Sequence, residues 1–125
     1  MCSHSIEEFG KKLIENVRDN AVESCDVTLS DNCNDKTSER WKNTAKIASV
    51  DELIKVVIPD VVDETIFHLL NSIDTGELCI FFKRDNGELI DLRKEGLGEL
   101  AGWYLGSEEW REKYSKCRFF DDFAD

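Results

Sequence analysis

Residues 77–92 have the sequence ELCIFFKRDNGELIDL, in which two β-prone runs flank Asn86-Gly87. Asn-Gly between apolar runs is the strongest short-range signal of a β-hairpin, because both residues tolerate the positive φ that a tight turn requires. The stretch therefore predicts a hairpin with strands at about 78–84 and 88–92.

The length of the hairpin loop decides which side chains face the core. A two-residue turn at Asn86-Gly87 would place Asp85 opposite Glu88, which is a like-charge pair. A three-residue loop with Gly87 in the left-handed bulge position instead pairs Arg84 with Glu88. It also places four apolar side chains on one face: Ile80, Phe82, Ile90 and Leu92. We predict the three-residue loop.

Helical patterns precede the hairpin. Ser5-Ile6-Glu7-Glu8 matches the capping-box pattern, and apolar residues then recur at helical spacing, which predicts a helix over about 5–24. Ser49-Val50-Asp51-Glu52 is a second capping box, and we expect its helix to end at Pro59. A third apolar face over residues 60–74, with Thr75-Gly76 as the exit, predicts a separate core helix.

A polar stretch follows the first helix. Residues 26–38 lack apolar periodicity and are rich in Asp, Asn, Ser and Thr. The stretch predicts a loop, and loops of this length are often mobile or functional. Trp41, Ala45 and Ala48 then indicate a short helix.

The chain after the hairpin is rich in aromatic residues. We predict one helix over 97–105 and another with Ser107 as its N-cap. Four rings lie here at helical spacing, and we expect three of them to be at least half buried: Trp103, Tyr104, Trp110 and Tyr114. The later cluster Phe119, Phe120 and Phe123 has no clear periodicity. Such a cluster either docks on the helices or forms an exposed partner site.

The order of elements indicates the fold class. Helices precede and follow one hairpin, without the alternating strand–helix pattern of a parallel sheet and without internal repeats. A length of 125 residues fits one domain. We therefore predict an α+β fold, a mostly helical single domain over 1–125 with the hairpin packed on helices.

The composition narrows the possible partners. The chain has 27 acidic and 16 basic residues, a formal net charge of -11. Its basic pairs all have acidic neighbours, which is unfavourable for nucleic-acid binding. No apolar run approaches the roughly 18–20 residues that span a bilayer, and the first residues show no secretory signal. We expect a cytoplasmic protein that binds neither nucleic acid nor membrane.

The sequence also argues against metal and cofactor sites. Five cysteines at wide spacings, Cys2, Cys25, Cys33, Cys79 and Cys117, are typical of reduced thiols. No cysteine or histidine spacing matches a zinc site. The loop that begins at Asp31 departs from a calcium-binding loop at Cys33, Lys36 and Lys42. Nucleotide-binding and hydrolase motifs do not occur, so we expect no metal and no cofactor.

His68 is the residue most suited to catalysis, but it lacks a motif. A general base needs an orienting acid and a nucleophile, and Asp63, Glu64 and the free thiols are the available partners. A lone histidine at a helix edge is more often structural or exposed to solvent. We therefore assign no catalytic residue.

Three functional hypotheses follow. The first is an acidic binding protein with a basic protein partner, such as an inhibitor or immunity protein for a nuclease-like toxin. Its candidate partner-binding residues are Glu108, Glu109, Trp110, Glu112, Asp121 and Asp122. The second is a ligand-binding or enzymatic domain with a pocket between the hairpin and the helices, lined by Trp41, His68 and Trp103. The third is an adaptor or structural protein that forms a homodimer through the open edge of the hairpin.

All three rest on one expectation about how the side chains are used. We expect the aromatic and branched apolar side chains to be used in the core. The anionic surface would then be the main feature available to other molecules.

Overall fold

The computed structural model describes residues 4–122, and its first element is one continuous helix in three parts. These parts are α1 (His4–Leu13), a π-helical turn η1 (Ile14–Arg18) and α2 (Asp19–Leu29). Leu13 and Asp19, at the two joints, keep right-handed helical dihedral angles, so the helix is not interrupted. The helix predicted over 5–24 is confirmed, and it continues to Leu29.

The polar loop is confined to residues 30–35, so it is shorter than the predicted 26–38. Asp35 caps α3 (Lys36–Ile47), and its carboxylate accepts the Ser38 N–H at 2.8 Å. The fully buried Ser38 hydroxyl donates to the carbonyl oxygen of Thr28 at 2.7 Å. Polar side chains therefore fix the end of α2 against the start of α3. In the sequence these residues only interrupt the apolar pattern, so the pattern does not reveal this structural role.

Pro59 lies inside a single 25-residue helix, α4 (Val50–Asp74), so the prediction that it separates two helices is wrong. The Ser49 hydroxyl caps this helix, as predicted, by accepting a backbone N–H at 3.2 Å. Proline lacks the N–H that would bond to the carbonyl four residues earlier, which here is that of Lys55. Arg118 Nε donates to this oxygen at 3.0 Å. A distant side chain thus supplies the bond that Pro59 cannot make.

The hairpin has the predicted register. Strand β1 (Phe81–Lys83) pairs antiparallel with β2 (Leu89–Asp91), and Phe82 lies opposite Ile90. The Arg84 N–H donates to the Glu88 carbonyl at 2.8 Å, and Gly87 has a φ of 90°. The three-residue loop is therefore confirmed. The strands are shorter than predicted because Leu92 already begins a helix, α5 (Leu92–Gly96).

The helices after the hairpin begin and end at other residues than predicted. Leu97 and Gly98 both have positive φ and separate α5 from α6 (Leu100–Gly102), which continues into the π-helical turn η2 (Trp103–Ser107). The Asp74 carboxylate at the end of α4 accepts the N–H groups of Leu100 and Ala101, each at 3.0 Å. The helix therefore starts at Leu100 instead of Leu97, because its capping carboxylate comes from another element.

Ser107 is not an N-cap. The last helix, α7 (Trp110–Tyr114), begins three residues later, after Glu109 in a left-handed conformation with a φ of 55°. Residues 115–122 then form an extended C-terminal tail without helix or strand. The prediction of a helix beginning at Ser107 is wrong, because η2 extends through that residue.

The core lies where α4 meets the first helix and α6. Val17, Ile73, Leu78 and Leu100 are buried together, and Trp103 and Trp110 pack against them. The two indole rings meet edge to face at 6.2 Å. Trp103, Tyr104 and Trp110 are more than half buried, whereas Tyr114 is 77% exposed, so the prediction for the four rings is confirmed.

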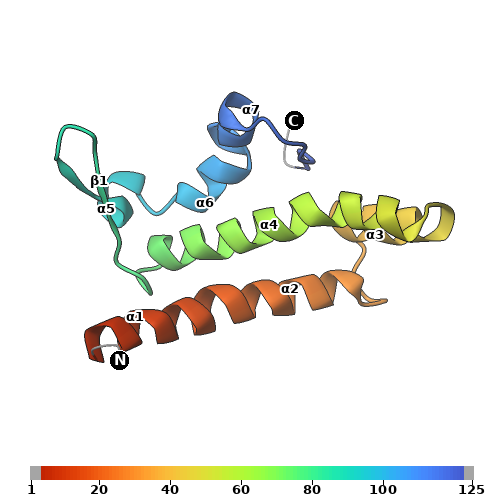
Figure 1. The fold of residues 1–125 in the computed structure, drawn as a ribbon, viewed down its shortest axis with the longest axis horizontal. Coiled ribbons are helices and arrows are strands. Elements are labelled where there is room, and N and C mark those ends of the chain that lie inside the picture. The colour runs from red at the N-terminus through yellow and green to blue at the C-terminus, as the bar shows by residue number, and fades with distance from the viewer. Residues whose placement is uncertain (1–3, 123–125) are drawn as a thin grey trace.

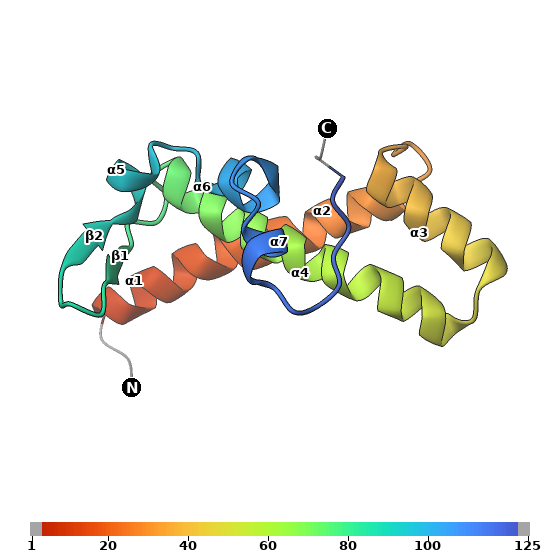
Figure 2. The same cartoon turned by 90° about the horizontal axis from the view of Figure 1, so that it is seen from above.

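The elements form three layers. The first helix lies below α4, and the segment from α5 to α7 lies above it (Figure 1). From above, the first helix and α4 cross, with α3 beside the N-terminal half of α4 (Figure 2). The protein is thus a mostly helical single α+β domain with the hairpin at one end, as predicted. Among residues 4–122, no helix has the length and apolar character required to span a bilayer.

Candidate functional site

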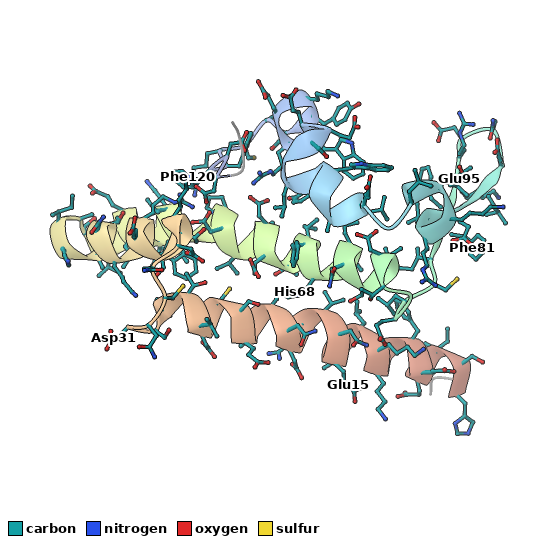
Figure 3. All side chains as sticks on the ribbon, turned by 180° about the vertical axis from the view of Figure 1, so that it is seen from behind. Glu15, Asp31, His68, Phe81, Glu95 and Phe120 are labelled. Carbon is teal, nitrogen blue, oxygen red and sulfur yellow. The ribbon has the colours of Figure 1, made fainter. Side chains whose placement is uncertain are left out.

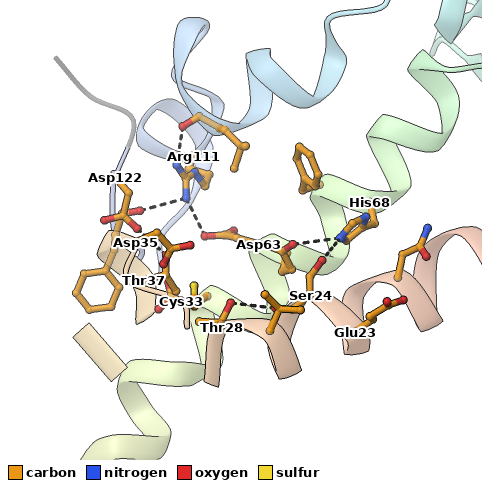
Figure 4. A pocket seen from close by; sticks show the side chains of 17 residues that line it. Glu23, Ser24, Thr28, Cys33, Asp35, Thr37, Asp63, His68, Arg111 and Asp122 are labelled. Atoms are coloured by element: carbon orange, nitrogen blue, oxygen red, sulfur yellow. Dashed lines mark hydrogen bonds and ion pairs between the residues drawn. The ribbon is translucent and has the colours of Figure 1, made fainter. Parts of the chain in front are cut away.

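An acidic cleft of about 510 Å³ lies between α2, the start of α3, α4 and the C-terminal tail (Figure 4). Six carboxylates line it: Glu23, Asp35, Asp60, Asp63, Glu64 and Asp122. Asp60, Asp63 and Glu64 are three and four residues apart on α4, so helical geometry places them on one face. The volume is within the range of small-molecule and side-chain binding sites. We refer to this site as the acidic cleft.

His68 lies in the wall of the cleft and links α4 to α2 (Figures 3 and 4). Its Nε2 atom lies 2.9 Å from the Ser24 hydroxyl oxygen and 3.1 Å from Glu64 Oε1. The spacing of Glu64 and His68, four residues apart on a helix, makes this pair visible in the sequence. The contact with Ser24 crosses 44 positions and had no signal in the sequence.

The arrangement around His68 does not form a catalytic relay. In a Ser–His–acid triad, the serine and the acid contact different ring nitrogens, so that the acid holds the tautomer that accepts the serine proton. Here both Ser24 and Glu64 contact Nε2. When Nε2 carries a proton and donates it to Glu64, the same nitrogen cannot also accept the Ser24 proton. The geometry therefore favours a polar wall that fixes α2 against α4.

A buried ion cluster closes one end of the cleft. The Arg40 guanidinium donates to both oxygens of Asp60 and both oxygens of Asp122, at 2.9 to 3.0 Å. The Trp41 indole N–H also donates to Asp60, at 2.7 Å. The Phe120 ring lies 3.9 Å from the Arg40 guanidinium carbon. Arg40 thus binds the C-terminal tail to α4 through both charge and stacking.

A second buried ion pair lies beside the first. Arg111 donates to Asp63 at 2.8 Å and to the Leu105 carbonyl at 2.7 Å, and the Tyr104 hydroxyl donates to the other Asp63 oxygen at 2.5 Å. Burial raises the pKa of Tyr104, and the hydrogen bond and charge of Asp63 raise it further. The Asp63 carboxylate is therefore an acceptor shared by two side chains from the upper layer.

Asp122 makes the stability of the fold depend on pH. Burial raises the pKa of Asp122, but the hydrogen bonds and charge of Arg40 outweigh it and hold that pKa below its usual value. Because the native pKa is the lower one, this carboxylate stabilises the fold fully above the unfolded value of about 3.9. That stability is lost as the pH falls through the lowered native pKa.

We predict that Asp122→Asn flattens this acid dependence. Urea unfolding, followed by tryptophan fluorescence from about pH 5 to about pH 2, should show a steeper loss of stability in the wild type than in the variant. Because the exposed Asp121 is in the same tail, Asp121→Asn is the matched control and should follow the wild type. Parallel curves for wild type and Asp122→Asn would contradict the assignment.

The predicted partner-binding residues fall into two groups. Glu108, Glu109, Glu112 and Asp121 are exposed, as a partner site requires. Trp110 is partly buried against Trp103, and Asp122 is bound to Arg40. Three exposed cations are close in sequence to the three glutamates: Lys113, Lys116 and Arg118. The surface around α7 is thus of mixed charge, and the carboxylates are concentrated at the acidic cleft instead.

Of the three residues predicted to line a pocket beside the hairpin, only His68 lines the acidic cleft. Neither Trp41 nor Trp103 lines the cleft, and the hairpin lies at the other end of the domain. Trp41 is buried between α3 and α4, and Trp103 belongs to the core beside Trp110. Of the C-terminal phenylalanines, Phe119 and Phe120 dock on the helices through Arg111 and Arg40, and Phe123 lies outside the described residues.

The fold and the site define the protein as a mostly helical α+β domain with an acidic cleft. Comparison of the chain with known protein families, characterised proteins and solved structures finds no match. Within residues 4–122, no three or more His, Cys, Asp or Glu side chains are arranged to hold a metal ion.

Proposed function

We propose that the protein binds a basic protein partner and that the acidic cleft accepts one of its lysine or arginine side chains. The observation that carries the proposal is the concentration of six carboxylates around one cleft. Only one of the residues that line it, Arg111, is a permanent cation, and Arg40 contacts Asp60 and Asp122. The cleft thus keeps a net negative charge after its internal ion pairs are counted.

The ion pairs within the chain are examples of the contacts that a partner cation would make in the cleft. Asp63 and Asp122 each bind a guanidinium group of the same chain at 2.8 to 2.9 Å. Glu23 and Asp35 are more exposed, and neither has an ion pair among the described contacts. A partner cation that entered between them would gain charge-assisted hydrogen bonds of the same kind. The formal charge of -11 would also accelerate its association by electrostatic steering.

The concrete form that we infer is a cytoplasmic inhibitor or immunity protein for a basic partner such as a nuclease-like toxin. Cys25, Cys33, Cys79 and Cys117 are free thiols, which is consistent with a reducing compartment. The exposed carboxylates Glu108, Glu109, Glu112 and Asp121 would contact the rim of the partner. In this arrangement the cleft provides specificity and the acidic surface provides a fast encounter.

Two charge-neutralising substitutions in the cleft test the proposal. Because Asn also caps helices, Glu23→Gln with Asp35→Asn removes two charges and keeps the α3 cap. We expect the double variant to bind the partner about tenfold more weakly, at roughly 0.7 kcal/mol per charge. The partner is obtained by capture from native lysate at about 0.05 M salt and released at about 0.5 M salt. Affinity is then measured by calorimetry with the purified partner.

The matched control is Glu7→Gln with Glu8→Gln, which removes the same charge roughly 20 Å away along the first helix. It should retain nearly the wild-type affinity. Capture that does not respond to salt, or equal weakening in both double variants, would show that the cleft is not the site.

A small organic cation is the second candidate for the cleft. Its volume and the polar wall formed by Ser24, Glu64 and His68 support this reading. Calorimetry with a linear polyamine distinguishes the two candidates. Saturable binding of the polyamine, lost in Glu23→Gln with Asp35→Asn, together with no captured basic protein, would favour the small ligand.

A further inference from the structure

The face of α4 that points away from the acidic cleft is apolar and exposed. Four of its side chains, Ile54, Ile58, Val61 and Val62, are 37 to 53% exposed. Val61 also lines a groove of about 430 Å³ between α4 and the first helix, together with Ile14 and Val22. These last two side chains are nearly half exposed. We call the surface made by Ile14, Val22, Ile54, Ile58, Val61 and Val62 the apolar face.

The total accessible surface is larger than that of a compact monomer of the same mass. The chain exposes 9078 Å², whereas a compact monomer of 14.4 kDa exposes roughly 6,800 Å². The excess of about 2,200 Å² is larger than the roughly 800 Å² per partner of a standard interface. It is close to what each chain buries in a large obligate dimer. A single copy thus leaves an area the size of a stable dimer interface exposed.

We infer that the apolar face is the interface of a homodimer. A second copy is the occupant that the charges favour, because the groove has one cation and one anion at its rim, Arg18 and Asp26. Arg18 also pairs with the exposed Asp19 of the same helix at 2.9 Å. Two chains of net charge -11 repel each other over most of their surface. The groove, in which Asp26 is the only lining carboxylate, is a place where they can approach each other.

The spacing of Arg18 and Asp26 along the first helix also fits a dimer with two-fold symmetry. Arg18 and Asp26 lie four residues before and four residues after Val22 on the first helix. If two copies of this helix pack antiparallel about a two-fold axis at Val22, Arg18 of each copy faces Asp26 of the other. Such an interface is self-complementary: apolar side chains at its centre are flanked by two ion pairs.

This interface is independent of both the cleft and the hairpin. On α4, Asp60 of the cleft lies on the opposite side from Ile58 and Val62, since residues two apart on a helix face away from each other. The groove around Val22 and the acidic cleft share no lining residue. The hairpin edges, which the sequence suggested for self-association, are only three residues long, so they offer few backbone hydrogen bonds to a partner.

Sedimentation equilibrium of the full chain at micromolar concentration tests the inference. The wild type should give about twice 14.4 kDa. Val22→Asp should weaken association at least about 100-fold, because two carboxylates would meet at the axis. Ile47→Asp is the matched control on an 88% exposed residue at the end of α3, and it should stay dimeric. A single-chain mass for the wild type would overturn the inference.

A charge exchange tests the two-fold arrangement. Arg18→Glu and Asp26→Arg should each weaken the dimer, and the double variant Arg18→Glu with Asp26→Arg should restore its affinity, because the pairs re-form with reversed sign. Far-UV circular dichroism confirms that each variant is folded. A double variant as weak as the singles, or Val22→Asp that remains dimeric, would exclude this interface.

Discussion

Arg111→Met should destabilise the protein by about 3 to 5 kcal/mol, because it removes one partner from a buried ion pair. The side chains of Arg111 and Asp63 are 8% and 15% exposed. Without Arg111, the Asp63 carboxylate loses a charge-assisted hydrogen bond, and the Leu105 carbonyl loses its 2.7 Å bond. A domain of this size is stable by roughly 5 to 15 kcal/mol. The variant should therefore unfold at much lower urea concentration.

Two further variants separate charge from packing. Arg111→Met with Asp63→Asn should recover much of the loss, since Asn removes the unpaired charge and still accepts the Tyr104 hydroxyl. The matched surface control is Arg84→Met, whose pair with Glu88 is 55% exposed on both sides and which should cost less than about 1 kcal/mol. Equal destabilisation by Arg111→Met and Arg84→Met would contradict the buried-pair explanation. Urea midpoints from tryptophan fluorescence provide the comparison.

Asp60→Leu should cost about 3 kcal/mol by a different route. Its carboxylate, 8% exposed, accepts the Trp41 indole N–H and two hydrogen bonds from Arg40. Leucine leaves the indole N–H without an acceptor in a site where Trp41 is 4% exposed. Arg40 retains Asp122, so its charge remains partly compensated. The loss is therefore expected at the lower end of the range for a buried pair.

The conservative variant Asp60→Asn distinguishes this effect from a loss of volume. Asn still accepts the indole N–H, so it should cost only about 1 to 1.5 kcal/mol. Glu88→Leu in the exposed hairpin pair is the control and should be nearly neutral. If Asn is as destabilising as Leu, the charge of Asp60, and not its hydrogen bonds, holds the cluster together.

These buried clusters explain where residues 115–122 of the C-terminal tail lie. Three arginines from different segments make these contacts. Arg40 of α3 donates to Asp122 of the tail, and Arg111 of α7 donates to Asp63 of α4. Arg118 of the tail donates to the Lys55 carbonyl of α4. Arg118 also completes the hydrogen bonding of α4 at Pro59. Cations that look like ordinary surface charges in the sequence thus hold the C-terminal tail against α4.

The expectation that the apolar side chains are used in the core is wrong for much of α4 and the first helix. Val22, Ile58 and Val62 follow helical apolar periodicity but are about half exposed. Periodicity identifies an apolar face and not what covers it. The same limit applies to the acidic residues, because Asp60 and Asp63 are internal ion-pair partners, whereas Glu23 and Asp35 are exposed.

The sequence by itself determined the features that depend on neighbouring residues: the hairpin register around Gly87, the cap at Ser49, the helix exit at Gly76 and the α+β class. These features follow from φ preferences, short hydrogen bonds and charge pairing over a few positions. Only the tertiary structure decided the continuity of α4 through Pro59, the start of α6 at Leu100 and the acidic cleft. Each of these depends on a side chain from 26 or more positions away, and such contacts leave no periodic signal in the chain.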